Sequence, residues 1–268
     1  LLTEWDRWRN EPRWAGFPEL ATVYFGGGTP SRLDPGTLTQ ILTRLAHDRR
    51  IATGAEITLE ANPEDVTLER ARSWRAAGIN RVSLGVQSFE PTVLEWMHRT
   101  HTAADAGRAV ESLRAGGIPQ ISLDLLYALP PEVPRSWADD LERALALEPD
   151  HLSLYGLTVE QHTPLSRWVT QGEAHPAPEE RYADEFLSAH SRLTRSGYRH
   201  YEVSNYARPG REAVHNSAYW RRSPYPGLGP SAHSGLGDLR WWNVREWSAW
   251  AEAILHGVST VVGEECLD

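Results

Sequence analysis

The chain contains no lysine, because all 27 of the basic residues in its 268-residue sequence are arginine. The absence of lysine excludes a Schiff-base mechanism and a P-loop lysine. A genomic bias toward arginine codons explains this composition without any function, since the two residues differ mainly at bidentate or stacked sites. The absence of lysine therefore excludes these two kinds of enzyme chemistry and gives no positive indication of function.

Sulfur-containing residues are almost absent. Cys266 is the only cysteine and Met97 the only methionine. A single cysteine excludes disulfide bonds within the chain and any metal cluster held by several of its own cysteines. Because the sequence begins at Leu1 rather than at methionine, we interpret it as a fragment of a longer protein.

The chain also lacks long apolar runs and blocks of like charge. Its formal net charge is -9, which predicts no nucleic-acid partner and no patch for a membrane surface. No apolar run reaches about 18 residues and no signal-peptide pattern appears, so membrane insertion is not expected and the cytoplasm is the predicted compartment. The length and a hydrophobic fraction of 40% are sufficient for one main domain.

Short β-branched or aliphatic runs alternate with amphipathic stretches, a pattern typical of βαβ units around a parallel sheet. The expected strands are residues 22–25, 56–60, 81–86, 121–127, 151–157 and 198–204. The expected helices are residues 35–48, 68–77, 102–115, 136–147 and 178–196. Gly78, Gly116 and Gly197 follow three of these helices, so we expect them to adopt the left-handed conformation that ends many helices.

The composition changes near residue 208, where proline, glycine, histidine and tryptophan become frequent. We therefore predict a barrel over residues 1–207 and the start of a small C-terminal lobe over residues 208–268. In this lobe we expect a strand at 239–244 and a helix at about 245–255. We interpret its tryptophans as core residues rather than as a cofactor site; they are Trp220, Trp241, Trp242, Trp247 and Trp250.

Three consecutive glycines, Gly26, Gly27 and Gly28, follow the first expected strand and precede Thr29 and Pro30. Without Cβ atoms, their backbone amides can come within hydrogen-bonding reach of a small ligand, and Pro30 stiffens the segment that follows. A tight turn alone is the alternative interpretation. A ligand cradle is the favoured one, because a turn needs only one glycine.

Polar residues recur at the carboxyl ends of the later strands. Glu60, Gln87, Asp124 and Tyr155 lie there, and in parallel barrels this edge contains the active site. A carboxylate buried in a strand needs a partner, which a ligand hydroxyl or ammonium group can provide. Structural alternatives remain open: Glu60 as a cap of the next loop, Gln87 as a partner of nearby backbone groups, and Asp124 paired with Arg99.

Several motifs follow one another in a recognisable order. They are Tyr-Phe-Gly-Gly-Gly-Thr-Pro-Ser, Glu-Ala-Asn-Pro, Val-Ser-Leu-Gly-Val-Gln-Ser-Phe, His-Arg-Thr-His and Asp-Leu-Leu-Tyr-Ala-Leu-Pro. Over about residues 21–250 the chain resembles the oxygen-independent coproporphyrinogen III oxidase-like family of radical S-adenosylmethionine (SAM) proteins. The resemblance implies an α/β fold, a partial (β/α)6 barrel of the TIM type that lacks its first strand, with a small C-terminal α+β segment.

The resemblance also implies a cofactor site. Gly27, Gly28 and Thr29 would hold the methionine end of SAM through backbone amides, and Glu60 would bind its amino or ribose groups. The positions that line a second SAM in the oxidase branch of the family correspond here to Gln87, Arg99 and Asp124. The family's four-iron four-sulfur (4Fe-4S) cluster needs a Cys-x-x-x-Cys-x-x-Cys motif that this sequence lacks. We expect those cysteines upstream of Leu1, a degenerate paralogue without a cluster being the alternative.

Residues 215–220, His-Asn-Ser-Ala-Tyr-Trp, resemble the His-Asn-x-x-Tyr-Trp motif of the heme chaperone branch of this family. The implied function is to bind SAM and heme and to deliver heme to an acceptor haemoprotein, with His215 as a heme-binding candidate. A hydrogen-bonded structural histidine is the alternative role of His215. Nearby arginines are candidates for binding the heme propionates, and simple exposure to solvent is the alternative; they are Arg211, Arg221, Arg222 and Arg240.

Two other functions are alternatives to heme delivery. The first is that of the oxygen-independent coproporphyrinogen III oxidase itself, against which the His-Asn-x-x-Tyr-Trp motif argues. The second is an ordinary barrel aldolase or isomerase, for which the sequence lacks both lysine and a late phosphate-binding glycine pair. A departure from the family pattern occurs at Ala128, where related proteins usually have glycine before Leu-Pro, so the geometry of that loop is uncertain from sequence.

Overall fold

The computed structural model describes residues 1–161 and 163–267, and its largest element is a seven-stranded sheet of order β1-β2-β3-β4-β5-β7-β6. The pairs β2/β3, β3/β4 and β4/β5 are parallel, whereas β7 is antiparallel to both β5 and β6. The strands are β1 (Glu19–Phe25), β2 (Arg50–Ala61), β3 (Arg81–Gln87), β4 (Gln120–Tyr127), β5 (His151–Gly156), β6 (Arg199–His200) and β7 (Asn205–Ala207).

Buried apolar residues alternate with small or polar residues along β3, so the two faces of this strand differ. In β3, Val82, Leu84 and Val86 are fully buried, because successive side chains of a strand point to opposite faces. The register places Leu84 beside Leu123 of β4, which is also fully buried. The other face of β3 presents Ser83 and small or polar residues, and this face borders the pocket described below.

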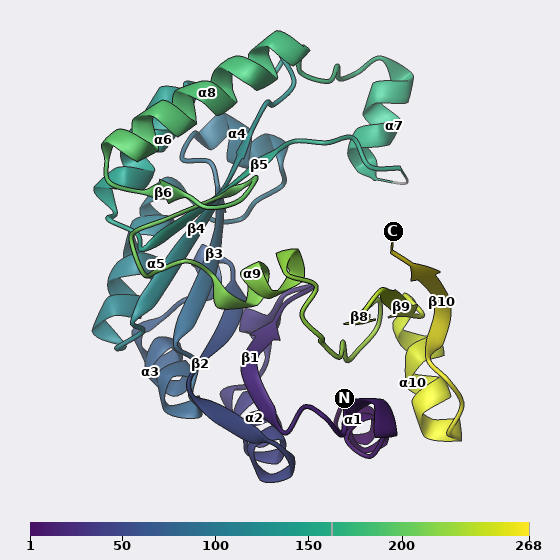
Figure 1. Cartoon of the computed structure of the whole chain (residues 1–268). Helices are drawn as coiled ribbons and strands as arrows, with labels where there is room; N and C mark the ends of the chain where they lie inside the picture. Colours follow the sequence, from purple (N-terminus) through teal and green to yellow (C-terminus); the bar gives the residue numbers. More distant parts are fainter. Residues whose placement is uncertain (162, 268) are drawn as a thin grey trace. The chain divides into compact units, whose positions relative to one another are not determined.

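Helices α3, α5, α6 and α8 cover the outer face of strands β2 to β5 (Figure 1). The helices are α1 (Leu2–Trp8), α2 (Pro35–Asp48), α3 (Leu68–Ala77), α4 (Pro91–Trp96), α5 (Ala103–Ala115), α6 (Trp137–Ala146), α7 (Pro164–Gln171), α8 (Glu179–Arg195), α9 (Val214–Trp220) and α10 (Trp247–His256). Among the described residues, no helix combines the length and apolar character that crossing a bilayer requires.

The α/β partial barrel expected from sequence is confirmed, with one local difference. The sixth expected strand, residues 198–204, consists instead of β6 and a turn that leads into β7. Tyr201 N–H donates to Asn205 O at 3.2 Å, so the chain reverses there and β7 returns antiparallel to β5. Gly78 and Gly197 have the expected positive φ angles of 110° and 85°. Gly116 does not: its φ is -77°, and the next residue, Gly117, adopts the left-handed conformation.

Contacts divide the chain into two compact units. Unit 1 comprises Leu1–Val23, Thr39–Ala55 and Val214–Asp268, and unit 2 comprises Tyr24–Leu38 and Glu56–Ala213. The boundary expected between residues 207 and 208 stays a prediction.

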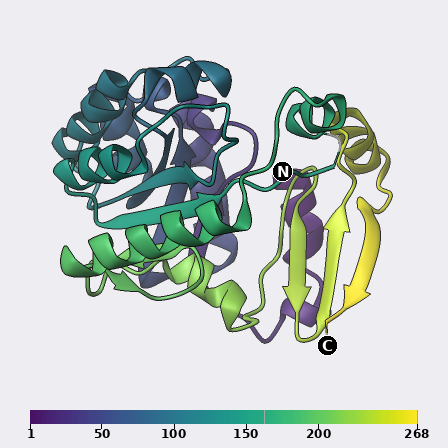
Figure 2. The same ribbon diagram turned by 90° about the horizontal axis from the view of Figure 1, so that it is seen from above.

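Unit 1 contains an antiparallel sheet of order β10-β9-β8, whose strands lie side by side in Figure 2. The strands are β8 (His233–Leu236), β9 (Leu239–Asn243) and β10 (Val261–Cys266), so the expected strand at 239–244 and the helix at 245–255 are present as β9 and α10. The core interpretation holds for Trp241 and Trp250, which are 3% exposed. It is wrong for Trp220 and Trp247, which are 59% and 68% exposed.

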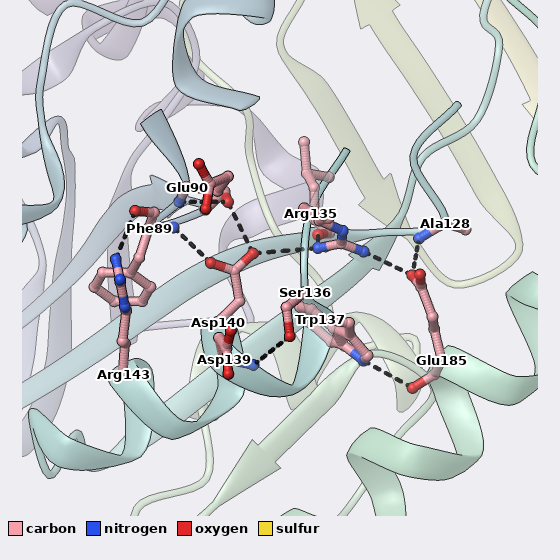
Figure 3. A network of polar contacts seen from close by, with 12 residues as sticks. Phe89, Glu90, Ala128, Arg135, Ser136, Trp137, Asp139, Asp140, Arg143 and Glu185 are labelled. Carbon is pink, nitrogen blue, oxygen red and sulfur yellow. Dashed lines mark hydrogen bonds and ion pairs between the residues drawn. The ribbon is translucent and has the colours of Figure 1, made fainter. Parts of the chain in front are cut away.

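A buried ionic network in unit 2 fixes the loop after β4 (Figure 3). The Arg135 side chain is fully buried between Asp140, at 3.3 Å, and Glu185, at 2.6 Å. Glu185 Oε2 also accepts a hydrogen bond of 2.7 Å from Ala128 N–H. Ala128 has a φ of 55°, a left-handed conformation that is costly for any residue with a Cβ atom. The loop therefore keeps the backbone that glycine would adopt without strain.

We expect Ala128→Gly to stabilise the protein by about 1 kcal/mol, because glycine relieves the left-handed strain at a position where the network already fixes the backbone. Urea unfolding monitored by tryptophan fluorescence measures this change. The matched control is Ala76→Gly in α3, an exposed helical position where the same substitution should destabilise by about 1 kcal/mol. Destabilisation by Ala128→Gly would contradict the strain argument.

Candidate functional site

A pocket of about 380 Å³ in unit 2 lies at the carboxyl ends of the parallel strands. Strand ends in this position gather side chains from consecutive βα units around one opening. The residues expected from sequence at this edge that line the pocket are Gly28, Thr29, Glu60, Gln87, Arg99, Asp124 and Tyr155. Gly27 belongs to the same cluster, since its N–H donates to Glu60 Oε2 at 3.1 Å.

The three glycines serve two different purposes. Gly27 and Gly28 have φ angles of 77° and 61°, and nothing lies within 4 Å of where their Cβ atoms would be. Glycine is therefore needed there for backbone conformation, and the space in front of both residues is open. At Gly26 a Cβ atom would lie 2.5 Å from the Tyr24 ring. An open cradle of this kind fits a small ligand that approaches the backbone.

Both carboxylate oxygens of Glu60 contact the first strand and the glycine segment. Tyr24 OH donates to Oε1 at 2.6 Å, and Gly27 N–H donates to Oε2. The alternative role of capping the loop after β2 is therefore wrong. Burial and the neighbouring Glu60 charge raise the pKa of Tyr24, so the tyrosine remains a hydrogen-bond donor.

The side chain of Asp124, in β4, lines the pocket. Ser83 Oγ lies 2.9 and 3.0 Å from its two oxygens. Burial raises the pKa of Asp124 to about 6, although hydrogen bonds from Ser153 and Ser83 act in the opposite direction. Asp124 and Arg99 form no ion pair in the described part of the chain, so that interpretation is wrong. Arg99 Nη1 donates instead to Asn62 Oδ1 at 3.4 Å.

Gln87 is held in the pocket by an irregularity of the sheet. Its φ is 66°, and the pairing of β3 with β4 shifts register between Leu84 and Gln87. Left-handed backbone at a non-glycine residue often marks a functional position. Sequence reasoning identified this side chain but not its conformation.

Sequence reasoning missed some residues that line the pocket. Tyr24, Asn62 and Ser83 belong to it and were not among the candidates. A signal for Ser83 existed in the sequence, because it shares with Gly85 and Gln87 the strand face opposite Val82, Leu84 and Val86.

The donor set fits SAM and does not fit its usual iron-sulfur partner. The N–H groups of Gly28 and Thr29, together with Arg99, suit a carboxylate, while Glu60 and Asp124 suit an ammonium group or ribose hydroxyls. The sole cysteine, Cys266, is exposed on β10 in unit 1. Among the residues with described positions, no group of three or more His, Cys, Asp or Glu side chains can hold a metal ion.

His215 belongs to α9 in unit 1 and engages both ring nitrogens within the protein. Nδ1 lies 2.7 Å from Thr22 Oγ1, and Nε2 lies 2.9 Å from Tyr219 OH. The Tyr219 ring meets the imidazole edge-on, with ring centres 4.9 Å apart. This geometry is that of a hydrogen-bonded structural histidine, and heme binding by His215 stays a prediction.

Comparison with known proteins identifies the family. The model of the radical SAM superfamily matches residues 3–144. The chain belongs to this superfamily. It is 38% identical to the heme chaperone HemW of Mycobacterium tuberculosis over 93% of its length, and 38% identical to that of Synechocystis sp. over 91%. It covers 64% and 60% of these relatives, so it spans about three fifths of their length.

The fold has a solved counterpart. The structure of coproporphyrinogen III oxidase (HemN) from Escherichia coli, a radical SAM enzyme, superposes on the whole chain with a TM-score of 0.77 and 23% sequence identity. The chain covers 65% of that structure. At this level of identity the match establishes the fold and leaves the activity open.

We predict that stability depends on the titration of Asp124. Its pKa of about 6 in the folded protein lies above the usual value near 3.9, so the folded state binds a proton more tightly than the unfolded state. The Asp124 contribution therefore becomes less favourable as pH rises from about 4 to 6. Asp124→Asn should become more stable relative to wild type over this range, by about 2–3 kcal/mol at neutral pH.

Urea unfolding at several pH values between 3.5 and 7.5 tests this prediction. Asp184→Asn, at an exposed position of α8, is the control and should show no such change relative to wild type. A stability difference between Asp124→Asn and wild type that is independent of pH would contradict the burial argument.

Proposed function

We propose that this chain belongs to a heme chaperone, which delivers heme to haemoproteins, and that it contains both a SAM-binding part and a heme-binding part. The observation that supports it most is the pocket of unit 2, where the glycine segment, Glu60, Gln87, Arg99 and Asp124 meet. The relatives described as heme chaperones supply the function, and the radical SAM family supplies the cofactor class.

The pocket residues would divide the recognition of SAM between them. The N–H groups of Gly28 and Thr29 would bind its carboxylate, joined by Gly27 N–H when that group leaves Glu60 Oε2. Glu60 would then bind the amino group or ribose of SAM. Gln87, Arg99 and Asp124 would bind either more distant parts of this ligand or a second SAM. When bound next to a reduced cluster, SAM supplies radical chemistry in this family. No side chain described here provides cluster ligands, so no radical step is assigned to these residues.

The heme-binding part would lie in unit 1, which contains the His-Asn-x-x-Tyr-Trp motif. Heme is cargo in this proposal, and an acceptor haemoprotein is the partner. The cytoplasm stays the predicted compartment. An oxidase acting on coproporphyrinogen is the alternative, since the superposed structure is such an enzyme.

We expect Glu60→Ala to weaken SAM binding at least tenfold, because it removes the hydrogen-bond acceptor for the ligand and releases the glycine segment, which Glu60 holds through Gly27 N–H. A loss of this size corresponds to about 1.4 kcal/mol. Isothermal titration of the full chain with SAM measures it, and Glu69→Ala at an exposed position of α3 is the matched control. Equal affinities for wild type and Glu60→Ala would contradict the site and favour an ordinary barrel enzyme.

We expect the full chain to bind hemin and to pass it to an apo-haemoprotein. Absorption spectra of mixtures with apomyoglobin report the transfer, because the acceptor spectrum appears as heme leaves the chain. The competing activity, decarboxylation of coproporphyrinogen, is measured on the same preparation with SAM and a reductant. Heme transfer without decarboxylation supports the chaperone, and decarboxylation without transfer would overturn it.

A further inference from the structure

A second hollow, of about 550 Å³, lies within unit 1. Its volume is within the range of about 300–1,000 Å³ that is usual for small-molecule sites. The wall combines aromatic, apolar and cationic side chains, and those used below are Tyr219, Arg222, Tyr225, His233, Leu239 and Arg240. Residues from the end of α9, from β8 and from β9 thus meet around one cavity.

The aromatic wall of this hollow is held in place from behind by His215. Tyr219 meets Tyr225 edge-on, with ring centres 4.6 Å apart and an interplanar angle of 83°. Tyr219 OH is in turn hydrogen-bonded to His215 Nε2, whose ring is anchored at Nδ1 by Thr22. To ligate a metal, His215 would have to give up one of these two hydrogen bonds.

His233 is differently placed. It is exposed, it lines the hollow from β8, and its ring lies against Trp242 with ring centres 5.6 Å apart. In the part of the chain that the structure describes, neither ring nitrogen of His233 takes part in a hydrogen bond. Trp242 therefore steadies an imidazole whose nitrogens remain available, and a neutral imidazole is a common axial ligand of heme iron.

The cationic residues of the hollow are paired with carboxylates on its rim. Arg222 lies 3.4 Å from Asp238, and Arg240 forms an ion pair with Glu265. All four side chains are between 39% and 71% exposed, and exposed pairs of this kind contribute little stability. Carboxylates of a ligand can therefore replace Asp238 and Glu265 as partners of the arginines, with favourable bidentate geometry.

We propose that this hollow is the binding site for a flat metalloporphyrin with two carboxylate arms, and that His233 is its axial ligand. Arg222 and Arg240 bind the carboxylates, and Tyr219 and Tyr225 contact the ring. His215 is then a positioning residue that holds Tyr219 in the wall. This inference rests on the proposed heme-chaperone function and assigns to it a site and a ligand that differ from the motif histidine.

Hemin titration of the full chain, followed by absorption and by electron paramagnetic resonance, separates the two histidines. We expect His233→Ala to lose the spectrum of histidine-ligated iron and to bind hemin at least tenfold more weakly, with free imidazole restoring the spectrum. His215→Ala should keep that spectrum, and His256→Ala, at an exposed position of α10, is the matched control. Far-UV circular dichroism verifies that each variant is folded.

A gain in affinity provides an independent test that misfolding cannot mimic. Glu265→Gln releases Arg240 from its carboxylate partner, so we expect it to bind hemin about threefold more tightly than wild type, in line with the modest energy of an exposed ion pair. Loss of the ligated spectrum in His215→Ala but not in His233→Ala would overturn the inference while leaving the proposed function intact. Failure of wild type to bind hemin at all would overturn the proposed function itself.

Discussion

The two hydrogen bonds accepted by the Glu60 carboxylate, from Tyr24 OH and Gly27 N–H, are the interaction on which the pocket of unit 2 depends. They connect the end of β2 with the end of β1 and keep the glycine segment beside the sheet edge. Burial and the Glu60 charge raise the pKa of Tyr24, so the tyrosine keeps the proton that it donates to Glu60. A ligand that binds Glu60 therefore acts on the glycine cradle as well.

The alternation of side chains between the two faces of each strand is the second constraint on the structure. It places apolar side chains of β3 under the helices and leaves Ser83 to contact Asp124 on the other face. The Ser83 hydroxyl thereby gives the Asp124 carboxyl group a hydrogen-bond partner within the protein. The register shift before Gln87 then turns the last side chain of the strand into the pocket. Core packing and site geometry thus arise from one alternating pattern.

Local signals in the sequence predicted the helices and the glycine segment well. The expected helices at 35–48 and 68–77 match α2 and α3, because capping residues and amphipathic spacing act within a few residues. The glycine segment was predicted as a place of close backbone approach, and the structure adds that Gly27 and Gly28 have positive φ angles. The motifs also gathered the correct strand ends into one pocket, since parallel topology brings those ends together.

Features set by distant contacts could not be predicted in the same way. The reversal at Tyr201 depends on pairing with Asn205 and β5. Gly116 packs on α3 so closely that a Cβ atom there would lie 2.5 Å from Ala71 Cβ. Arg99 and Asp124 looked complementary by charge, yet Asn62 and Ser83 are their partners. Charge indicates which residues can pair, and only the packed sheet determines which do.

Unit 1 depends on a single buried carboxylate in a comparable way. Glu4 of α1 is 1% exposed and accepts hydrogen bonds from Gly229 N–H and Asn243 Nδ2, both at 2.7 Å. Asn243 N–H in turn donates to Ala232 O at 3.0 Å, immediately before His233 at the start of β8. Since a buried polar group is tolerated only with such partners, the network restricts how β8 and β9 can pair. Asn243 thus links the start of β8, where His233 lies, to a residue of the first helix.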